Sequence, residues 1–265
     1  MTQETALSKK YSDLAVFRQT FLEEAWDAAE LTLPFILPRN ATYNQTLPTP
    51  YQGVGARGIN NLTAKLLLTL FPPNSPFFKF QIDDFTLEEL EAQRAPVEEG
   101  LNSMERAVMD EIEGKAMRVP LNECIRHLLI TGNAVLHADK NNAIRVFHLD
   151  QYVVRRDPQG VVLEIVVKEQ MSRELYKDLF NSAPPKETGT SADGNEKELS
   201  LYTSVRRVGN KIKVRQEVND KRIPGTDSEY PLDKNPWLAL RYNAIDGEDY
   251  GRGFVEEYLG DLKTV

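Results

Sequence analysis

The stretch LYTSVRRVGNKIKVRQEV, residues 201–218, contains two runs of alternating apolar and polar side chains joined by Gly209-Asn210. Alternation with a period of two is typical of a strand that buries one face. A glycine–asparagine pair between two such runs favours a tight hairpin turn. The stretch therefore predicts two antiparallel strands, Leu201–Val208 and Lys211–Val218.

Further strand-like segments flank this hairpin. Residues 172–180 have the pattern of a short helix, and residues 183–198 (APPKETGTSADGNEKE) contain almost no apolar side chain, which is typical of a mobile loop. We therefore predict an antiparallel β-rich region over 133–250 with a mobile loop at 183–198. Its other strands are expected at 134–138, 144–147, 152–156, 161–167 and 237–242.

Helical periodicity dominates the chain before residue 133. Arg18 lies beside the apolar seam of the first helix, where we expect its stem to pack and its charged head to reach out. Phe77, Phe78 and Phe80 suggest an extended, buried crossing. Gly132-Asn133 is a helix stop signal. Helices are expected from Leu7 to Ala28, from Val54 to Leu70, from Pro96 to Ile112 and from Leu121 to Leu129.

The chain thus divides into a helical region over 1–132, the β-rich region, and a last segment, 251–265. That segment starts a helix near Phe254 and shows no stop signal at Val265. The fold class is α+β, with a helical N-terminal half and antiparallel hairpins after it.

Composition limits the function classes. The 265 residues carry a formal net charge of −8, which does not favour tight adhesion to nucleic acid. The single cysteine excludes an intrachain disulfide and fits a reducing compartment. No stretch is long and apolar enough to predict a membrane-spanning helix.

The densest basic cluster lies in the hairpin, where Arg206-Arg207 precede Lys211, Lys213 and Arg215. Alternation places the last three side chains on one face of their strand. Such a cluster suits nucleic acid, an acidic neighbour, or simply a solvated hairpin face. The sequence leaves these three alternatives open.

Gly53–Gly58 matches the dinucleotide-binding pattern G-x-G-x-x-G letter for letter. That pattern binds a pyrophosphate only between a strand and a helix. The preceding residues, 46–52, include prolines and make a poor central strand. A loop that packs closely as it enters a helix is the other interpretation.

Metal and catalytic chemistry find little support. Cys124 and His127 are three residues apart on one predicted helix, but they lack the companions that a metal needs. The acidic run Asp246–Asp249 lacks the spacing of a calcium loop and favours a solvated loop. No phosphate-binding G-x-x-x-x-G-K-[ST] pattern occurs. We predict no cofactor, no metal and no catalytic residue.

Three stretches resemble the head-to-tail connector (portal) family of short-tailed, podovirus-type bacteriophages, in the same order and with similar spacing. They are YQGVGARGINNL (51–62), continuing through AKL (64–66) to LFP (70–72); YVVRRD (152–157) with GVVL (160–163); and DGEDYGRGFVEEYLGDL (246–262). The acidic loop and the lysine-rich hairpin do not match closely.

The resemblance implies the outer wing of a subunit in a dodecameric ring, followed by the start of a stem helix at 251–265. Family members are about twice as long, so we expect the clip, the tunnel-lining helix and the crown beyond Val265. The resemblance also implies a place at one vertex of the virion, assembly in the host cytoplasm, and double-stranded DNA passing through the ring. The implied partners are further copies of the chain, terminase, scaffolding protein, major capsid protein and a tail adaptor. ATP hydrolysis belongs to the terminase.

Two groups of residues are candidates for packing or for a subunit interface. One comprises Arg57, Asn60, Asn61 and Lys65 in the second helix; the other comprises Arg252, Glu256 and Glu257, which could form salt bridges at the junction of wing and stem. Two other functions compete with a passive ring: a nucleotide-binding enzyme built on Gly53–Gly58, and a virion adaptor that binds the ring without forming one.

Overall fold

The structure is a computed structural model, and it describes residues 6–39, 46–50, 52–73, 75–82, 94–139, 141, 143–183, 185 and 199–264. The loop predicted at 183–198 lies outside the described residues, apart from Ala183 and Pro185. Among the described residues, no helix combines the length and the apolar character that crossing a membrane requires.

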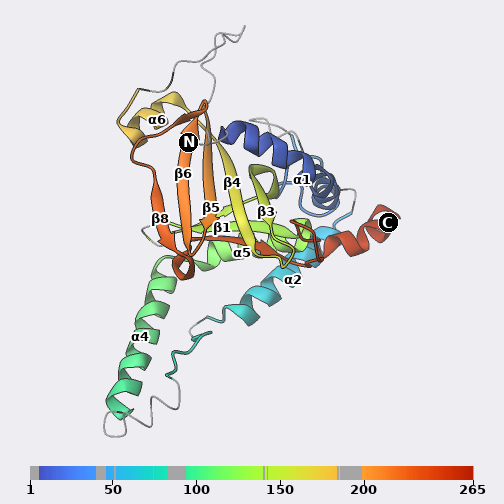
Figure 1. The fold of residues 1–265 in the computed structure, drawn as a ribbon. Coiled ribbons are helices and arrows are strands. Elements are labelled where there is room, and N and C mark those ends of the chain that lie inside the picture. Colours follow the sequence, from blue (N-terminus) through green and yellow to red (C-terminus); the bar gives the residue numbers. More distant parts are fainter. Residues whose placement is uncertain are drawn as a thin grey trace.

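The α+β fold class is confirmed, with helices first and antiparallel sheets after them (Figure 1). The change from helix to strand falls at Gly132, in the left-handed conformation that ends α5. The helices are α1 (Leu7–Glu30), α2 (Val54–Leu70), α4 (Arg94–Gly114), α5 (Arg118–Thr131), α6 (Arg173–Phe180) and α7 (Leu259–Thr264).

The strands form two antiparallel sheets. In the smaller sheet β1 (Asn133–Ala138) lies between β2 (Ile144–Phe147) and β9 (Trp237–Arg241). The larger sheet has the order β3-β4-β5-β6-β7, and β8 also pairs with β6. Its strands are β3 (Tyr152–Arg156), β4 (Val162–Met171), β5 (Leu199–Val208), β6 (Lys211–Val218), β7 (Lys221–Arg222) and β8 (Ser228–Pro231).

The predicted hairpin is confirmed as β5 and β6, with Gly209 at φ +59° in the turn. A second tight turn, which sequence reasoning did not identify, joins β6 to β7. Asn219 and Asp220 both have positive φ there, as a type I′ turn requires.

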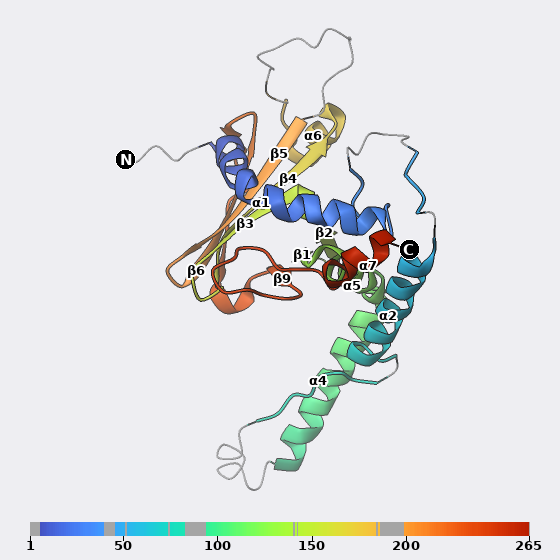
Figure 2. The same ribbon diagram turned by 90° about the vertical axis from the view of Figure 1, so that its right-hand side faces the viewer.

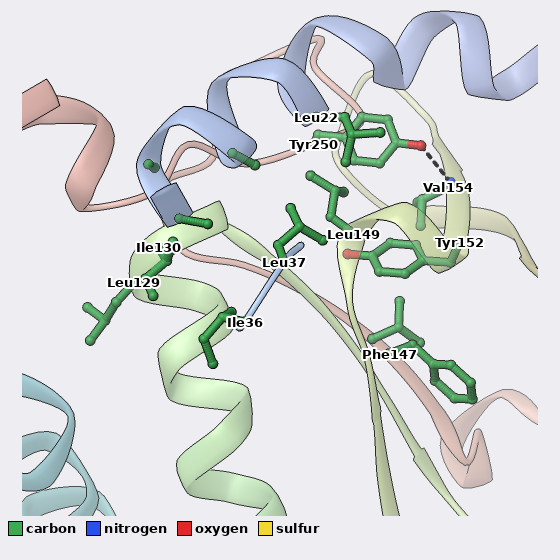
Figure 3. Close-up of a cluster of buried hydrophobic side chains, with 14 of the residues drawn as sticks. Leu22, Ile36, Leu37, Leu129, Ile130, Phe147, Leu149, Tyr152, Val154 and Tyr250 are labelled. Carbon is green, nitrogen blue, oxygen red and sulfur yellow. Dashed lines mark hydrogen bonds between the residues drawn. The ribbon is translucent and has the colours of Figure 1, made fainter. Parts of the chain in front are cut away.

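One core holds the two halves of the chain together. Side chains from α1, α5, β1 and the larger sheet meet in it, and Leu37, Leu129 and Tyr152 are almost fully buried (Figure 3). Tyr250, from the last loop, inserts into the same core, and its hydroxyl accepts a hydrogen bond from the Val154 amide at 3.0 Å. Tyr250, near the C-terminal end of the chain, therefore attaches the last loop to strand β3 of the larger sheet.

Arg18 does not reach out to solvent, so that prediction was wrong. Its side chain is 6% exposed, and its Nη1 donates to the carbonyls of Leu149, Asp150 and Tyr152 at 2.7–3.0 Å and to the Tyr11 hydroxyl. Four acceptors compensate the burial of this charge. They fix α1 across one face of the larger sheet (Figure 2).

Two further expectations need correction. Residues 75–82 form neither a strand nor a buried crossing, since Phe77 and Phe80 are 38% and 41% exposed. The C-terminal helix does not start as one regular helix. A 3-10 turn, η4 (Val255–Tyr258), precedes α7. The division into wing and stem regions stays a prediction.

Candidate functional site: the C-terminal junction and the α2 surface

The segment Gly251–Gly253 crosses the end of α5 with backbone against backbone. A Cβ atom on Gly132 would lie 2.4 Å from the carbonyl carbon of Arg252, and one on Gly253 would lie 2.5 Å from the Ile130 carbonyl oxygen. Gly132 also has φ +73°, a conformation that other residues rarely adopt. Only glycine fits this crossing without displacing the backbone.

Asn133 holds the same crossing through its side chain. Its Nδ2 donates to the carbonyls of Gly251 (2.7 Å) and Thr131 (2.9 Å), and its Oδ1 accepts from the Gly251 amide at 2.7 Å. The side chain is buried, so these bonds replace water for every group involved. The end of α5 and the start of the C-terminal segment thus form one rigid junction.

Arg252 lies between these glycines and contacts three carboxylates. Its guanidinium pairs with Glu24 of α1 at 2.5 Å, with Glu256 at 2.9 Å and with Glu248 at 3.1 Å. It also stacks on the Phe21 ring, 4.6 Å from the centroid. Burial raises the pKa of Glu256, and the hydrogen bond from Arg252 opposes that rise. The cluster ties α1 to the C-terminal segment.

The structure brings Arg252 and Glu256 together in an ion pair. Glu257 does not join them; its carboxylate accepts a hydrogen bond from Asn243 Nδ2 at 3.0 Å. Farther along, Lys263 of α7 pairs with Asp27 of α1 at 2.9 Å. Glu24, the most distant partner of Arg252 in the sequence, carries no local signal that could have identified it.

The four α2 residues form a separate group on the solvent side of that helix. Arg57, Asn60, Asn61 and Lys65 are all exposed, while Gly55, Ile59 and Thr63 face the body. Among the described residues, no carboxylate pairs with Arg57 or Lys65, and Arg57 Nε donates to the Gly53 carbonyl at 3.2 Å. This surface is available to another molecule.

A cavity of about 330 Å³ lies between α2 and the last helices. Its lining is almost entirely apolar and includes Val54, Ile59, Leu62, Phe254 and Leu262. Its walls come from the two parts of the chain that hold predicted site residues. Without convergent polar groups, it offers packing space rather than a catalytic pocket.

The segment Gly53–Gly58 lacks the setting of a dinucleotide site. The described residues before it, 46–50 and 52, form no strand, and every strand pair described is antiparallel. Gly55 has a packing reason instead: a Cβ there would lie 2.7 Å from the Leu31 carbonyl oxygen. The expected loop is in fact the start of the helix: Gly53 is the N-cap of α2, and Val54–Gly58 form its first turn, packed closely against the end of α1.

Three other candidate sites remain: the Cys124 thiol, a possible metal site and the acidic run 246–249. Burial raises the pKa of Cys124 to about 12, which leaves an unreactive thiol. In the described part of the chain, no three His, Cys, Asp or Glu side chains gather closely enough to hold a metal ion. The run 246–249 is not simply a solvated loop, because Asp249 accepts from the Arg156 amide and Glu248 pairs with Arg252.

These features define a structural chain in which charged and glycine-rich contacts fix elements to one another. The chain belongs to the family of bacteriophage head to tail connecting proteins, whose model matches residues 4–265. It is 36% identical over 273 residues to the portal protein of Enterobacteria phage T3, covering 99% of this chain and 50% of that protein. It is 32% identical over 278 residues to the portal protein of Escherichia phage T7, with the same coverage of each chain. For the portal protein of Enterobacteria phage SP6 the identity is 26% over 267 residues, covering 99% and 52%. The chain spans about half the length of these relatives.

Proposed function

We propose that this chain is the outer part of a portal subunit, a structural component of a ring at the head–tail vertex of a phage virion. The observation that carries the proposal is the family match over 4–265, together with portal relatives that align over 99% of the chain. We propose no bond-making chemistry for it. A dodecameric ring and contacts with terminase, scaffolding protein, major capsid protein and tail adaptor, around passing DNA, complete the proposal.

The junction suits such a role. A closed ring requires each subunit to present two different surfaces in a fixed relation, because the contact is heterologous. The glycine crossing, the Asn133 side chain and the Arg252 cluster hold the C-terminal segment against α1 and α5. Rigid subunits repeat the same angle at every contact, which closure demands.

We assign different roles to the two predicted groups. Arg57, Asn60, Asn61 and Lys65 would contact a neighbouring molecule, because they are exposed on α2. Arg252 and Glu256 would fix packing within the subunit, because their partners are already in the same chain. Glu257 would support the loop at Asn243.

Native mass spectrometry and negative-stain imaging of the complete gene product test the proposal. Rings with rotational symmetry and a central hole are expected, whereas persistent monomers would overturn the ring. An adaptor that binds a ring without forming one would instead remain monomeric and associate with a purified portal ring. A thermal-shift titration with NAD and ATP tests the enzyme alternative, and we expect no saturable stabilisation.

A further inference from the structure

Helix α4 extends from the body as an arm. It makes no extensive contact with any other described helix or strand, and both ribbon views show it projecting away from the sheets (Figures 1 and 2). Its apolar stripe is Leu101, Met104, Val108 and Ile112, of which Met104 is 61% exposed and Val108 is 39% exposed. Helical stability in water comes mostly from packing an apolar face. Leu101 and Ile112 are already half-buried, so the exposed part of the stripe, Met104 and Val108, is the surface that a partner would cover.

The arm is also strongly acidic. Its 21 residues contain six acidic and two basic side chains, a formal net charge of −4 in a chain whose total is −8. Glu98 and Glu105 are seven residues apart, so they lie on the same side of the helix, next to the stripe. A partner that covers the stripe meets these carboxylates as well.

A basic surface, opposite in charge to the acidic arm α4, lies on the larger sheet. Strand register puts Arg155, Arg206, Lys211 and Lys213 on the face that α1 only partly covers, and all four are exposed. We call these four residues the basic face. Glu229 of β8 pairs with both lysines, at 3.1 and 3.0 Å, and within the described residues it is the one carboxylate that does so. One exposed carboxylate thus serves the two lysines, and among the described residues it does not pair with Arg155 or Arg206.

We propose that α4 of one subunit lies on the basic face of the next subunit in the ring. The inference rests on the proposed ring and specifies two surfaces that meet in it. An arm and a body surface are different parts of one chain, so their contact is heterologous and repeats from subunit to subunit. Opposite charge sets the register of the contact, and burial of Met104 and Val108 stabilises it.

Charge exchange between subunits tests this contact. The arm variant is Glu98→Lys/Glu105→Lys, and the sheet variant is Lys211→Glu/Lys213→Glu. Each alone places like charges at every interface, so we expect at least a tenfold loss of ring in native mass spectrometry of the complete gene product. An equimolar mixture of the two variants should restore rings in which the variants alternate, because each reversed surface then meets its complement.

Matched control variants carry the same change in charge at residues outside the two proposed contact surfaces. Glu99→Lys/Asp110→Lys alters the other side of α4, and Lys221→Glu/Lys234→Glu alters exposed lysines outside the basic face; both should assemble as the wild type does. Circular dichroism and thermal melting check the fold of every variant. If the sheet variant unfolds, Lys211→Gln/Lys213→Gln replaces it and should still reduce ring formation.

Three results of the assembly assay would overturn the inference: rings of either reversed variant at the wild-type level, an equal loss of rings in the controls, or no recovery of rings in the mixture. A fourth is a sheet variant that forms rings normally but loses its salt-dependent retention on double-stranded DNA. The last result would make the basic face a DNA surface. A wild-type chain that never associates would overturn the ring and this contact together. A ring that tolerates every reversal would leave the ring standing and remove only the contact.

Discussion

The side-chain amide of Asn133 forms two hydrogen bonds of 2.7 Å with the backbone N–H and C=O of Gly251, a residue 118 positions later in the chain. The amide carries its donor and its acceptor on two separate atoms, which match the backbone C=O and N–H of Gly251, so the pairing depends on asparagine. We expect Asn133→Ala to lower the free energy of unfolding by about 2–4 kcal/mol, because buried groups of Gly251 lose their partners. Urea denaturation followed by fluorescence measures the change.

Asn61→Ala, at an exposed position of α2, is the control and should change the free energy of unfolding by less than about 0.5 kcal/mol. Equal effects of the two substitutions would contradict the structural role of Asn133.

Two glycines of α2 should respond in opposite ways to alanine. Gly55→Ala forces a Cβ to within 2.7 Å of the Leu31 backbone, so we expect a loss of stability of about 1–3 kcal/mol. Gly58 has no atom within 4 Å of the corresponding position, so Gly58→Ala should increase stability by about 0.5–1 kcal/mol through helix propensity. Thermal denaturation compares the pair. Destabilisation by Gly58→Ala would show that this glycine has a role beyond flexibility.

Removal of the Arg252 guanidinium leaves Glu24, Glu248 and Glu256 without their shared cation. Burial already raises the pKa of Glu256, so its contribution to stability falls as pH rises through its folded-state pKa. Arg252→Ala also removes the hydrogen bond that lowers this pKa, and the pKa of Glu256 should rise further. We expect a loss of about 1–2 kcal/mol at pH 7.5 and a smaller loss at pH 5.

Guanidinium denaturation at the two pH values measures this difference. The double variant Arg252→Ala/Glu256→Gln should show a smaller pH dependence than Arg252→Ala, because the titrating carboxylate is gone. A loss independent of pH would mean that packing on Phe21, rather than charge, accounts for the role of Arg252.

The Cys124 thiol should be inert in the folded chain. Burial raises its pKa to about 12, so almost no thiolate is present at pH 8. We expect a thiol-specific disulfide reagent to label the native chain at least a hundredfold more slowly than the chain in 6 M guanidinium, on the order of the ratio that a pKa shift of this size implies. Rapid, stoichiometric labelling of the native chain would place the thiol at the surface.

Local sequence patterns predicted much of the fold. Helix α2 and strands β3 and β6 have the predicted bounds, because their periodicity and turn residues are adjacent in the chain. The patterns did not predict the pairing of β1 with β9, which joins segments about a hundred residues apart, or the short strands β7 and β8. Asn219-Asp220 was the available signal for β7.

The candidate site was harder to predict, because its contacting residues also lie far apart in the sequence. Arg252 and Glu256 were among the candidates for salt bridges, but Glu24 lies 228 positions from Arg252, and Asn133 contacts Gly251, 118 positions away. Arg18 appeared to be a surface residue, and only the folded chain gathers four acceptors around it. Partners that tertiary packing supplies leave no mark in a local pattern.

The glycine crossing at Gly132, Gly251 and Gly253 has a mechanical consequence. No flexible side chain separates the two backbones there, so the direction in which α7 leaves the body is set by the same peptide groups that end α5 and begin β1. A load applied along α7 would pass through η4 and this backbone contact into the paired strands of the small sheet. A larger side chain at any of these three glycines would consequently change the angle between α7 and the rest of the fold, even where the fold itself survives.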